Sequence, residues 1–455
     1  MTHPDHNPQQ GMLRRVGRLV VLLAFLGSTI LILGMVGEPR PDRTVKRAVL
    51  DVHYLTAQKQ KRPGLSKAYL SLIAAHEGWT PDTLRRLGDL YQQQRNITAA
   101  AAAYERSLRG QPPEDADLPA LRLLTEAALQ RLDWMAAQSA LQGIIRLVPT
   151  DQTAHLQLGL LLLPTSPTEG LRHMAQAAEG YPTLYTVIGA TLVTYSDDPP
   201  PIKAYRLALV YLNTIPSSID SLPFVEYALV TALNGEYNAP GVWAILGLVR
   251  ARSGREGEAL IRRALEAAPD DPTVSYAAGA YFRLRADYRE ALRLLLTAAA
   301  LAPENPAIPA EIGALYRDQG LNAEAATWFA NAAALAPDNP TYGALQATFY
   351  ADANVDLTGE GLAALQRLSA RFPTSADVLA ALGWAYLSGG RHDEARLMLS
   401  QALAYEPGNS RAWFYYGVLL ETLGEKGGAV EAYRVVVRAG GLFRENAARG
   451  IARLG

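Results

Sequence analysis

The sequence predicts an all-α fold: an α-solenoid, an elongated stack of helical hairpins, preceded by a single transmembrane helix. Three observations predict this fold class. A pattern of residues is written twice, at an interval of 34 residues, between Pro272 and Asn339. Within each copy the apolar residues recur at spacings of three and four, which is the period of an α-helix. Residues 19–36 form one uncharged apolar run that is long enough to cross a bilayer.

The repeated pattern consists of small and large residues at fixed offsets. Each copy follows a joint, 303–306 or 337–340, in which Asn can accept hydrogen bonds from the first helical N–H groups and Pro pre-sets the first helical residue. A break near Gly320 divides the copy into two helices, so the unit is a helical hairpin. Inside a helix, glycine is about 1 kcal/mol less favourable than alanine. A glycine at the same offset in both copies therefore indicates a helix crossing without room for a side chain. The matching residues are Gly279, Phe282, Ala291, Leu295, Ala298 and Pro303, then Gly313, Tyr316, Ala325, Phe329, Ala332 and Pro337.

This pattern resembles the tetratricopeptide repeat, which has a period of 34 residues and opens with Trp and Leu-Gly. The two copies match it except at the opening Trp, which Trp243 and Trp413 supply in other copies. The resemblance implies a right-handed superhelix of hairpins. It also implies that the first helix of each hairpin lines a concave groove, where a peptide or a helix of a partner protein binds.

Composition excludes several classes of function. A net charge of −1 and a pI near 6.7 leave no basic excess for nucleic acid, so we expect no DNA or RNA partner. The absence of cysteine excludes disulfides, thiolate metal sites and a cysteine nucleophile.

Taken in order, the chain begins with a polar segment, 1–18, that we expect to be a disordered tail. His3 and His6 lie in this tail without a third metal ligand. Residues 19–37 are predicted to be a transmembrane anchor. A cleaved signal peptide is the alternative, because three arginines precede the run. The anchor is favoured because the run is long and Met35 stands where a cleavage site needs a small residue.

The orientation of this anchor rests on the basic residues at its two ends, which nearly balance. Arg14, Arg15 and Arg18 precede the run, and Arg40, Arg43, Lys46 and Arg47 follow it. Because arginines close to a first apolar segment are typical of N-inside anchors, we predict a single-pass membrane protein whose repeat domain lies outside the cytoplasm.

The remaining chain divides into sub-arrays. Residues 44–216 form an N-terminal tetratricopeptide-like sub-array, whose last unit is interrupted at 197–201. Residues 217–239 hold one helical stretch, 224–233, between turn-forming residues, and are predicted to be an irregular joint. The alternative is a decayed repeat whose partner helix the sequence hides. Residues 240–441 form the clearer C-terminal array, and residues 442–455 are predicted to be a capping helix with one polar face.

The family resemblance implies that the groove positions lie on the first helices of the C-terminal hairpins. They are small, apolar and aromatic, so we predict that they hold an apolar segment of a partner with Trp384 and Phe414 as anchors. In the alternative, the alanines serve the helix and the aromatic residues pack against the next repeat. The predicted groove residues are Tyr276, Ala280, Arg283, Ala310, Ala314, Arg317, Ala380, Trp384, Leu387, Phe414, Val418 and Glu421.

Some proteins with this repeat bind a C-terminal carboxylate with Lys and Asn at these positions. The N-terminal half offers Arg85 with Asp89 and Arg122 with Glu126 instead. No Lys and Asn set is present, so we do not expect such a clamp.

No catalytic pattern is visible. The glycines of 424–428 stand between two helices, whereas a phosphate-binding loop follows a strand. The acidic pairs 197–198 and 270–271 stand at helix starts, where carboxylates cap N–H groups. We therefore predict no catalytic residue, metal site, cofactor or small-molecule substrate. The histidines outside the tail, which occur singly, are His53, His76, His155, His173 and His392.

Two functional classes fit this sequence. The first is a membrane-anchored scaffold that recruits or assembles other proteins at the cell envelope. The second is a regulatory or substrate-recruiting subunit of an envelope enzyme system that handles polysaccharide or secreted protein. A catalytic partner that co-purifies at one copy per chain would distinguish the second class from the first.

Overall fold

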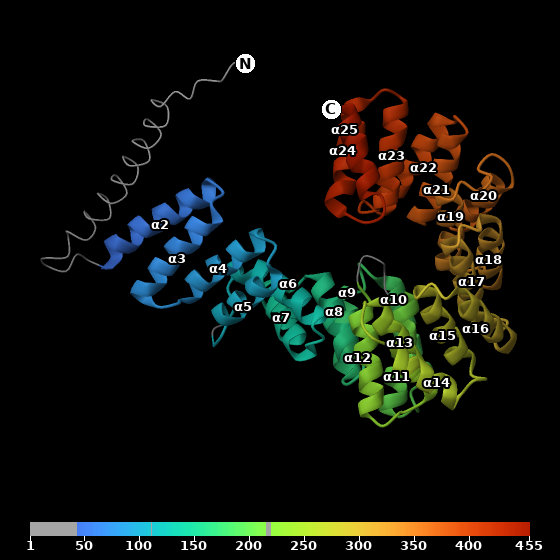
Figure 1. The fold of residues 1–455 in the computed structure, drawn as a ribbon, viewed down its shortest axis with the longest axis horizontal. Coiled ribbons are helices and arrows are strands. Elements are labelled where there is room, and N and C mark those ends of the chain that lie inside the picture. The colour runs from blue at the N-terminus through green and yellow to red at the C-terminus, as the bar shows by residue number, and fades with distance from the viewer. Residues whose placement is uncertain (1–42, 111, 215–219) are drawn as a thin grey trace, which may run out of the picture. The chain divides into compact units, whose positions relative to one another are not determined.

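A computed structural model describes residues 43–110, 112–214 and 220–455 (Figure 1). All regular structure in these ranges is helical, which confirms the all-α prediction. Within the described residues the chain separates into two compact units, one formed by residues 43–161 and 169–182 and the other by residues 162–168 and 183–455.

The first unit is a series of helical hairpins. From α2 to α7, each α-helix packs against the next one along the chain. The long connection between α5 and α6 contains a short 3-10 helix, η1. Its helices are α2 (Arg43–Lys59), α3 (Pro63–Glu77), α4 (Pro81–Gln93), α5 (Ile97–Ser107), η1 (Asp115–Asp117), α6 (Leu118–Gln130), α7 (Trp134–Leu147), α8 (Gln152–Leu162) and α9 (Pro167–Ala177).

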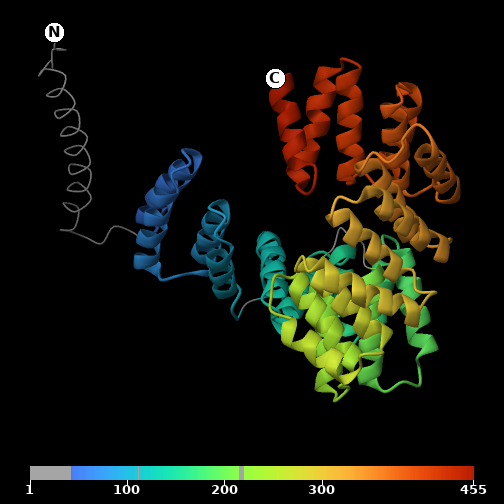
Figure 2. The ribbon, with the colours of Figure 1, turned by 45° about the vertical axis from the view of Figure 1, so that its right-hand side comes forward.

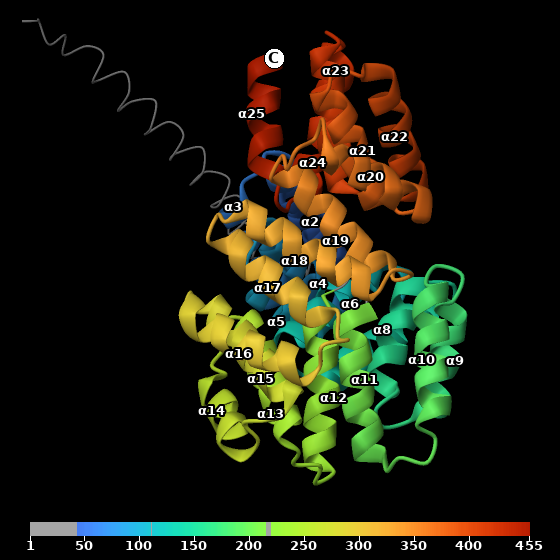
Figure 3. The ribbon, with the colours of Figure 1, turned by 90° about the vertical axis from the view of Figure 1, so that its right-hand side faces the viewer.

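The second unit continues the same plan. From α11 onward each helix packs against the next, and first helices also pack against first helices, as α13 does with α15 and α19 with α21. Figure 3 shows α13 to α16 side by side, and Figure 2 shows the last three helices in red. The helices are α10 (Pro182–Thr194), α11 (Pro200–Thr214), α12 (Leu222–Asn234), α13 (Pro240–Arg252), α14 (Glu258–Ala267), α15 (Pro272–Leu284), α16 (Tyr288–Leu301), α17 (Ala307–Asp318), α18 (Asn322–Leu335), α19 (Pro340–Asp352), α20 (Glu360–Arg371), α21 (Ala376–Ser388), α22 (His392–Tyr405), α23 (Ser410–Thr422), α24 (Lys426–Ala439) and α25 (Arg444–Leu454).

The joints between hairpins begin helices as predicted. Asn339 is the N-cap of α19, its side chain accepts a hydrogen bond from the backbone N–H of Thr341 at 3.0 Å, and Pro340 opens the helix. Asn305 accepts in the same way from Ala307 at 3.1 Å. These bonds satisfy N–H groups that a helix start leaves without an intrahelical partner.

The repeated glycines lie where the two helices of a hairpin cross. A Cβ atom built at Gly313 would lie 2.9 Å from Cδ1 of Phe329, and one built at Gly383 would lie 2.7 Å from Cγ of Leu399. Both distances are shorter than ordinary carbon contacts, so at these two crossings a side chain would have to displace its neighbour. The prediction from the repeated glycine is confirmed at these positions.

Within a hairpin, the turn uses one left-handed residue at a fixed place. This residue lies seven positions after the crossing residue, and at Gly320 its φ is 74°. The predicted break near Gly320 is thereby confirmed, since α17 ends at Asp318 and α18 begins at Asn322. Three hairpins place Arg95, Leu132 and Ala286 in this conformation, with φ between 58° and 60°.

The region predicted as an irregular joint, 217–239, contains α12, which packs against α11 and α13. Its apolar residues Phe224 and Leu229 are fully buried. The buried carboxylate of Glu226 accepts hydrogen bonds from Arg250 at 3.3 Å and from Nη1 of Arg255 at 2.9 Å. Such contacts are also what the alternative, a decayed repeat, would give, so the joint stays a prediction. The limits of the two sub-arrays stay a prediction, which limited proteolysis can test.

The predicted membrane localisation needs correction. None of the helices in the described ranges is both long and apolar enough to cross a membrane. The longest, α2, has 17 residues and carries charges along its length, whereas a span needs about 20 mainly apolar residues. We therefore withdraw the prediction of a single-pass protein with an extracytoplasmic repeat domain. The tail 1–18 and the anchor 19–37, from which it came, lie outside the described residues.

Candidate functional site

The first helices of the C-terminal hairpins, α15, α17, α19, α21 and α23, carry the candidate site. They place the twelve predicted groove residues in three environments. Those buried by their own chain are Ala280, Ala314, Ala380 and Leu387; those half-buried are Tyr276, Arg283, Ala310, Trp384, Phe414, Val418 and Glu421; and Arg317 is exposed.

Four aromatic rings connect α21, α23 and the segment that precedes α25. The indole of Trp384 stacks on Tyr415, with ring centroids 4.6 Å apart and an interplanar angle of 23°. Its Nε1 donates a hydrogen bond to Oδ1 of Asn354 at 3.0 Å. Phe414 stacks on Phe443 at 4.7 Å and 14°. Both predicted anchors therefore pack within the array, as the alternative expected, and Trp384 keeps part of its surface exposed.

Next to this aromatic cluster lies a set of paired charges. Arg411 of α23 binds Asp352, the last residue of α19, and lies 4.0 Å from Asp377 of α21. The hydroxyl of Tyr415 donates to the same Asp352 carboxylate at 2.9 Å. Burial, together with the charge of Asp352, raises the pKa of Tyr415. Because α21 lies between α19 and α23 in sequence, this cluster ties together first helices two hairpins apart.

A second charged cluster has the same form. Glu311 of α17 accepts a hydrogen bond from Nε of Arg283 at 2.7 Å and lies 3.9 Å from Arg252 of α13. Arg283 also binds Asp318, which ends α17. Arg283 is therefore held between two carboxylates, with 11% of its side chain exposed. It is not free to bind a carboxylate of a partner.

The predicted groove residue Glu421 is likewise engaged. It accepts two hydrogen bonds from Arg453 of α25, at 2.7 and 2.8 Å, and one from the hydroxyl of Tyr433 at 2.7 Å. The hydrogen bond from Arg453 lowers the pKa of Glu421.

Sequence reasoning missed the paired acids of this surface, although the sequence holds a signal for two of them. Asp318 and Asp352 both lie five residues after the crossing residue of their hairpins, Gly313 and Ala347. At that offset a residue ends the first helix, and in these two hairpins its carboxylate binds an arginine of another first helix. The pairing itself depends on how hairpins stack, which the pattern does not encode.

In the first unit, the arginines at groove positions form ion pairs with acidic residues that lie later in the chain. Arg85 binds the buried Asp117 at 2.8 Å, and Arg122 binds Asp151 at 2.9 Å. Asp89 accepts a hydrogen bond from the hydroxyl of Tyr104 at 2.6 Å. These residues stabilise the stack of hairpins.

Two histidines that stand apart in the sequence meet in the structure. His155 and His173 are both buried, and their Nδ1 atoms lie 2.9 Å apart. Within the described ranges no group of three or more His, Cys, Asp or Glu side chains is arranged to hold a metal ion.

A family model described as tetratricopeptide repeat matches residues 358–399 and 381–441. Among solved structures, yeast Tom70 is similar over 91% of this chain and 96% of its own, with 13% identity and a TM-score of 0.44. MamA is similar over 39% of this chain and 94% of its own, with 24% identity and a TM-score of 0.31.

YrrB, described as a TPR protein with an unusual peptide-binding site, is similar over 42% of this chain and 97% of its own, with 17% identity and a TM-score of 0.31. No curated protein matches the sequence. Residues 358–441 therefore carry tetratricopeptide repeats, and the earlier hairpins share their crossing and turn positions.

Proposed function

We propose that this chain is a non-catalytic scaffold, and that its C-terminal array holds a segment of a partner protein against the first helices of the hairpins. The repeat fold supports a protein–protein interaction scaffold, because a stack of hairpins presents one long surface. The twelve groove residues form the proposed surface. Contact with the partner is made by those that keep exposed surface, chiefly Tyr276, Arg317, Trp384 and Val418. The buried alanines let neighbouring helices approach closely.

The orientation of Trp384 carries this proposal. Its ring is stacked on one side and hydrogen-bonded at Nε1, so it is fixed before any partner arrives. A rigid aromatic side chain loses little conformational entropy on binding and tends to dominate the binding energy. A partially exposed tryptophan held in this way is suited to receive an apolar side chain of a partner.

The charged clusters favour an apolar segment over a chain terminus. Arg283 and Arg411 lie between carboxylates of their own chain, so a terminal carboxylate would have to displace an existing ion pair. An apolar segment leaves these pairs intact and buries the exposed part of Trp384.

Co-purification with the full chain tests the proposal. We expect Trp384→Ala to lose a protein that the wild-type chain retains. The matched control is Trp413→Ala, because Trp413 is also half-buried in the C-terminal array but packs edge-on against Tyr416 and donates to the carbonyl of Pro407. Circular dichroism must show that both variants remain helical. Retention of the same partners by folded Trp384→Ala would contradict the proposal.

A further inference from the structure

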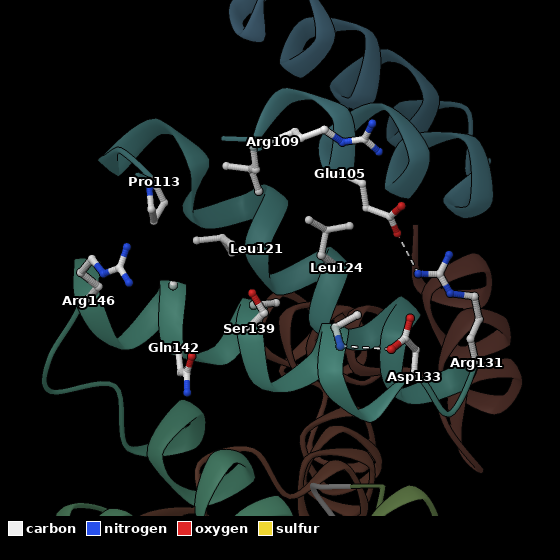
Figure 4. A pocket seen from close by; sticks show the side chains of 14 residues that line it. Glu105, Arg109, Pro113, Leu121, Leu124, Arg131, Asp133, Ser139, Gln142 and Arg146 are labelled. Carbon is white, nitrogen blue, oxygen red and sulfur yellow. Dashed lines mark hydrogen bonds and ion pairs between the residues drawn. The ribbon is translucent and has the colours of Figure 1, made fainter. Parts of the chain in front are cut away.

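A cleft of about 460 Å³ opens in the first unit between α5 and α7, the second helices of two consecutive hairpins (Figure 4). Its lining includes none of the twelve groove residues proposed above. Its floor is Leu121 and Leu124 of α6, which are buried except for 5% and 8% of their surface. Leu108 and Pro113 add apolar surface at the end nearest the α5–α6 connection.

The cleft exists because the two helices offer little bulk between them. α5 is short, and residues 99–103 are all alanine. On α7, the side that lines the cleft carries Ala136, Ala140 and Gly143. A Cβ atom at Gly143 would lie 3.0 Å from Cδ2 of Leu121, so any larger residue there would press on the apolar floor.

The rim of the cleft is positively charged. Arg109, Arg131 and Arg146 line it, and Figure 4 shows their guanidinium groups on different sides of the two leucines. Arg131 is paired with Glu105 at 2.9 Å. Arg109 and Arg146 have no ion-pair partner among the residues that the structure describes.

The acidic residues of the lining are already engaged. Glu105 binds Arg131, and Asp133 caps α7 by accepting a hydrogen bond from the N–H of Ala136 at 3.1 Å. The cleft therefore combines an apolar floor with two uncommitted cations and, among its described lining residues, no uncommitted anion. Aromatic rings, on which nucleic acid bases would stack, are absent from that lining.

We propose that this cleft docks a short acidic segment of a partner protein. An aliphatic side chain of the segment lies on Leu121 and Leu124, and flanking carboxylates bind Arg109 and Arg146. Guanidinium groups match carboxylates with two parallel hydrogen bonds, which gives such a contact both strength and orientation. The inference rests on the proposed scaffold function and adds a second binding surface of different chemistry to it.

The test uses the full chain and an array of short peptides that combine Asp, Glu, Leu and Ser in varied order. A second array replaces the acidic residues by Lys and Arg, and a third replaces Leu by Gly. The strongest acidic binder is then measured in solution by fluorescence anisotropy. We expect binding to the first array only, and weaker binding as NaCl rises from about 50 to about 500 mM, because surface ion pairs are screened.

The double variant Arg109→Glu with Arg146→Glu should weaken binding of that peptide about tenfold or more, since two attractive contacts become repulsive. The control is Arg106→Glu, which makes one such charge reversal on α5, at an exposed residue outside the cleft lining. It should bind the peptide like the wild-type chain. Trp384→Ala, a change outside the cleft lining, should also bind the peptide like the wild-type chain.

Several outcomes would overturn the inference. They are no acidic peptide bound at about 1 mM, equal binding of acidic and basic peptides, equal affinity in the double variant and the wild-type chain, or binding of a single-stranded oligonucleotide that the double variant alone loses. If Trp384→Ala also loses a partner protein in the co-purification test, the scaffold proposal still stands. Any of these results would then contradict only the proposal about the cleft.

Discussion

His155 of α8 and His173 of α9 form a buried pair whose proton positions follow from its neighbours. Nε2 of His155 lies 3.0 Å from the carbonyl oxygen of Pro149 and therefore donates to it. In a neutral ring, Nδ1 of His155 must then accept, so Nδ1 of His173 donates across the 2.9 Å contact. Nε2 of His173 is left facing the guanidinium of Arg172 at 3.5 Å. The arrangement suits two neutral rings.

This pair predicts a stability that depends on pH. Burial, with contributions from His155 and Arg172, lowers the pKa of His173, while Glu169 opposes this shift. The unfolded chain, where the pKa is near its ordinary value of about 6.5, then binds the proton more readily than the folded chain. We expect α8 and α9 to lose protection from hydrogen exchange as pH falls below about 6.5, when measured by mass spectrometry after correction for the intrinsic exchange rate.

The variant His173→Asn should flatten this dependence, because the amide can still donate to Nδ1 of His155 but does not titrate. His76→Asn, at an exposed residue of α3, is the control and should keep it. A dependence that is unchanged in His173→Asn would assign the effect to other groups.

The two helices of a hairpin pack against each other where they cross, and in several hairpins a glycine lies at this crossing. A Cβ atom at position 313 would lie 2.9 Å from Phe329, whose ring is 1% exposed and lies 4.8 Å from that of Phe349. The ring is enclosed and has little room to move aside. We expect Gly313→Ala to destabilise the chain by about 1–3 kcal/mol, the usual cost of overpacking, although alanine favours helix.

Gly189→Ala is the matched control for this prediction. Gly189 also lies within a helix, α10, but a Cβ atom there would have no neighbour within 4 Å. The substitution Gly189→Ala should therefore stabilise the chain by about 0.5–1 kcal/mol through helix propensity alone. Urea denaturation of both variants measures the difference, and equal effects at the two glycines would show that crowding at the crossing does not matter.

At the level of the helices, much of the fold could be predicted because the residues that begin helices and form turns act on the chain next to them. Asn339 with Pro340 marks a helix start, and Gly320 marks a turn, without reference to the rest of the chain. The same turn was harder to recognise where Leu132 and Ala286 take the left-handed conformation, since neither residue favours it. The packing of α12 could not be predicted from the repeat pattern, because its contacts come from α11 and α13.

At the level of the whole array, the candidate site could be predicted only in part. The family pattern identified the first helices, but not that Phe443 covers Phe414 or that Arg411 reaches Asp352. These contacts connect residues from different hairpins of the second unit, so they depend on the rotation between hairpins. The groove residues therefore stay a prediction, whereas the charges around them became visible only in the structure.

The last helix of the second unit shows how stability is distributed along the stack. In a repeat array, each unit is stabilised mainly by its neighbours, so an end needs a cover for its apolar face. α25 packs against α24, Ala447 is fully buried there, and Gly450 meets the ring of Tyr433. Arg453 extends the contact to Glu421 of α23. We proposed from the sequence that residues 442–455 form a cap, and these contacts support it.

Ala447→Asp tests this role, because it places a carboxylate in a buried contact without a partner. We expect a local loss of roughly 3 kcal/mol or more, whereas Arg449→Ala, on the same helix with 74% of its side chain exposed, should have little effect. Hydrogen exchange should rise in α23 to α25 and remain unchanged in α13 to α16, since nearest-neighbour coupling weakens with distance along the stack. Exchange that rises equally in all hairpins of this unit would mean that it unfolds as one cooperative body, and that α25 is not a local cap.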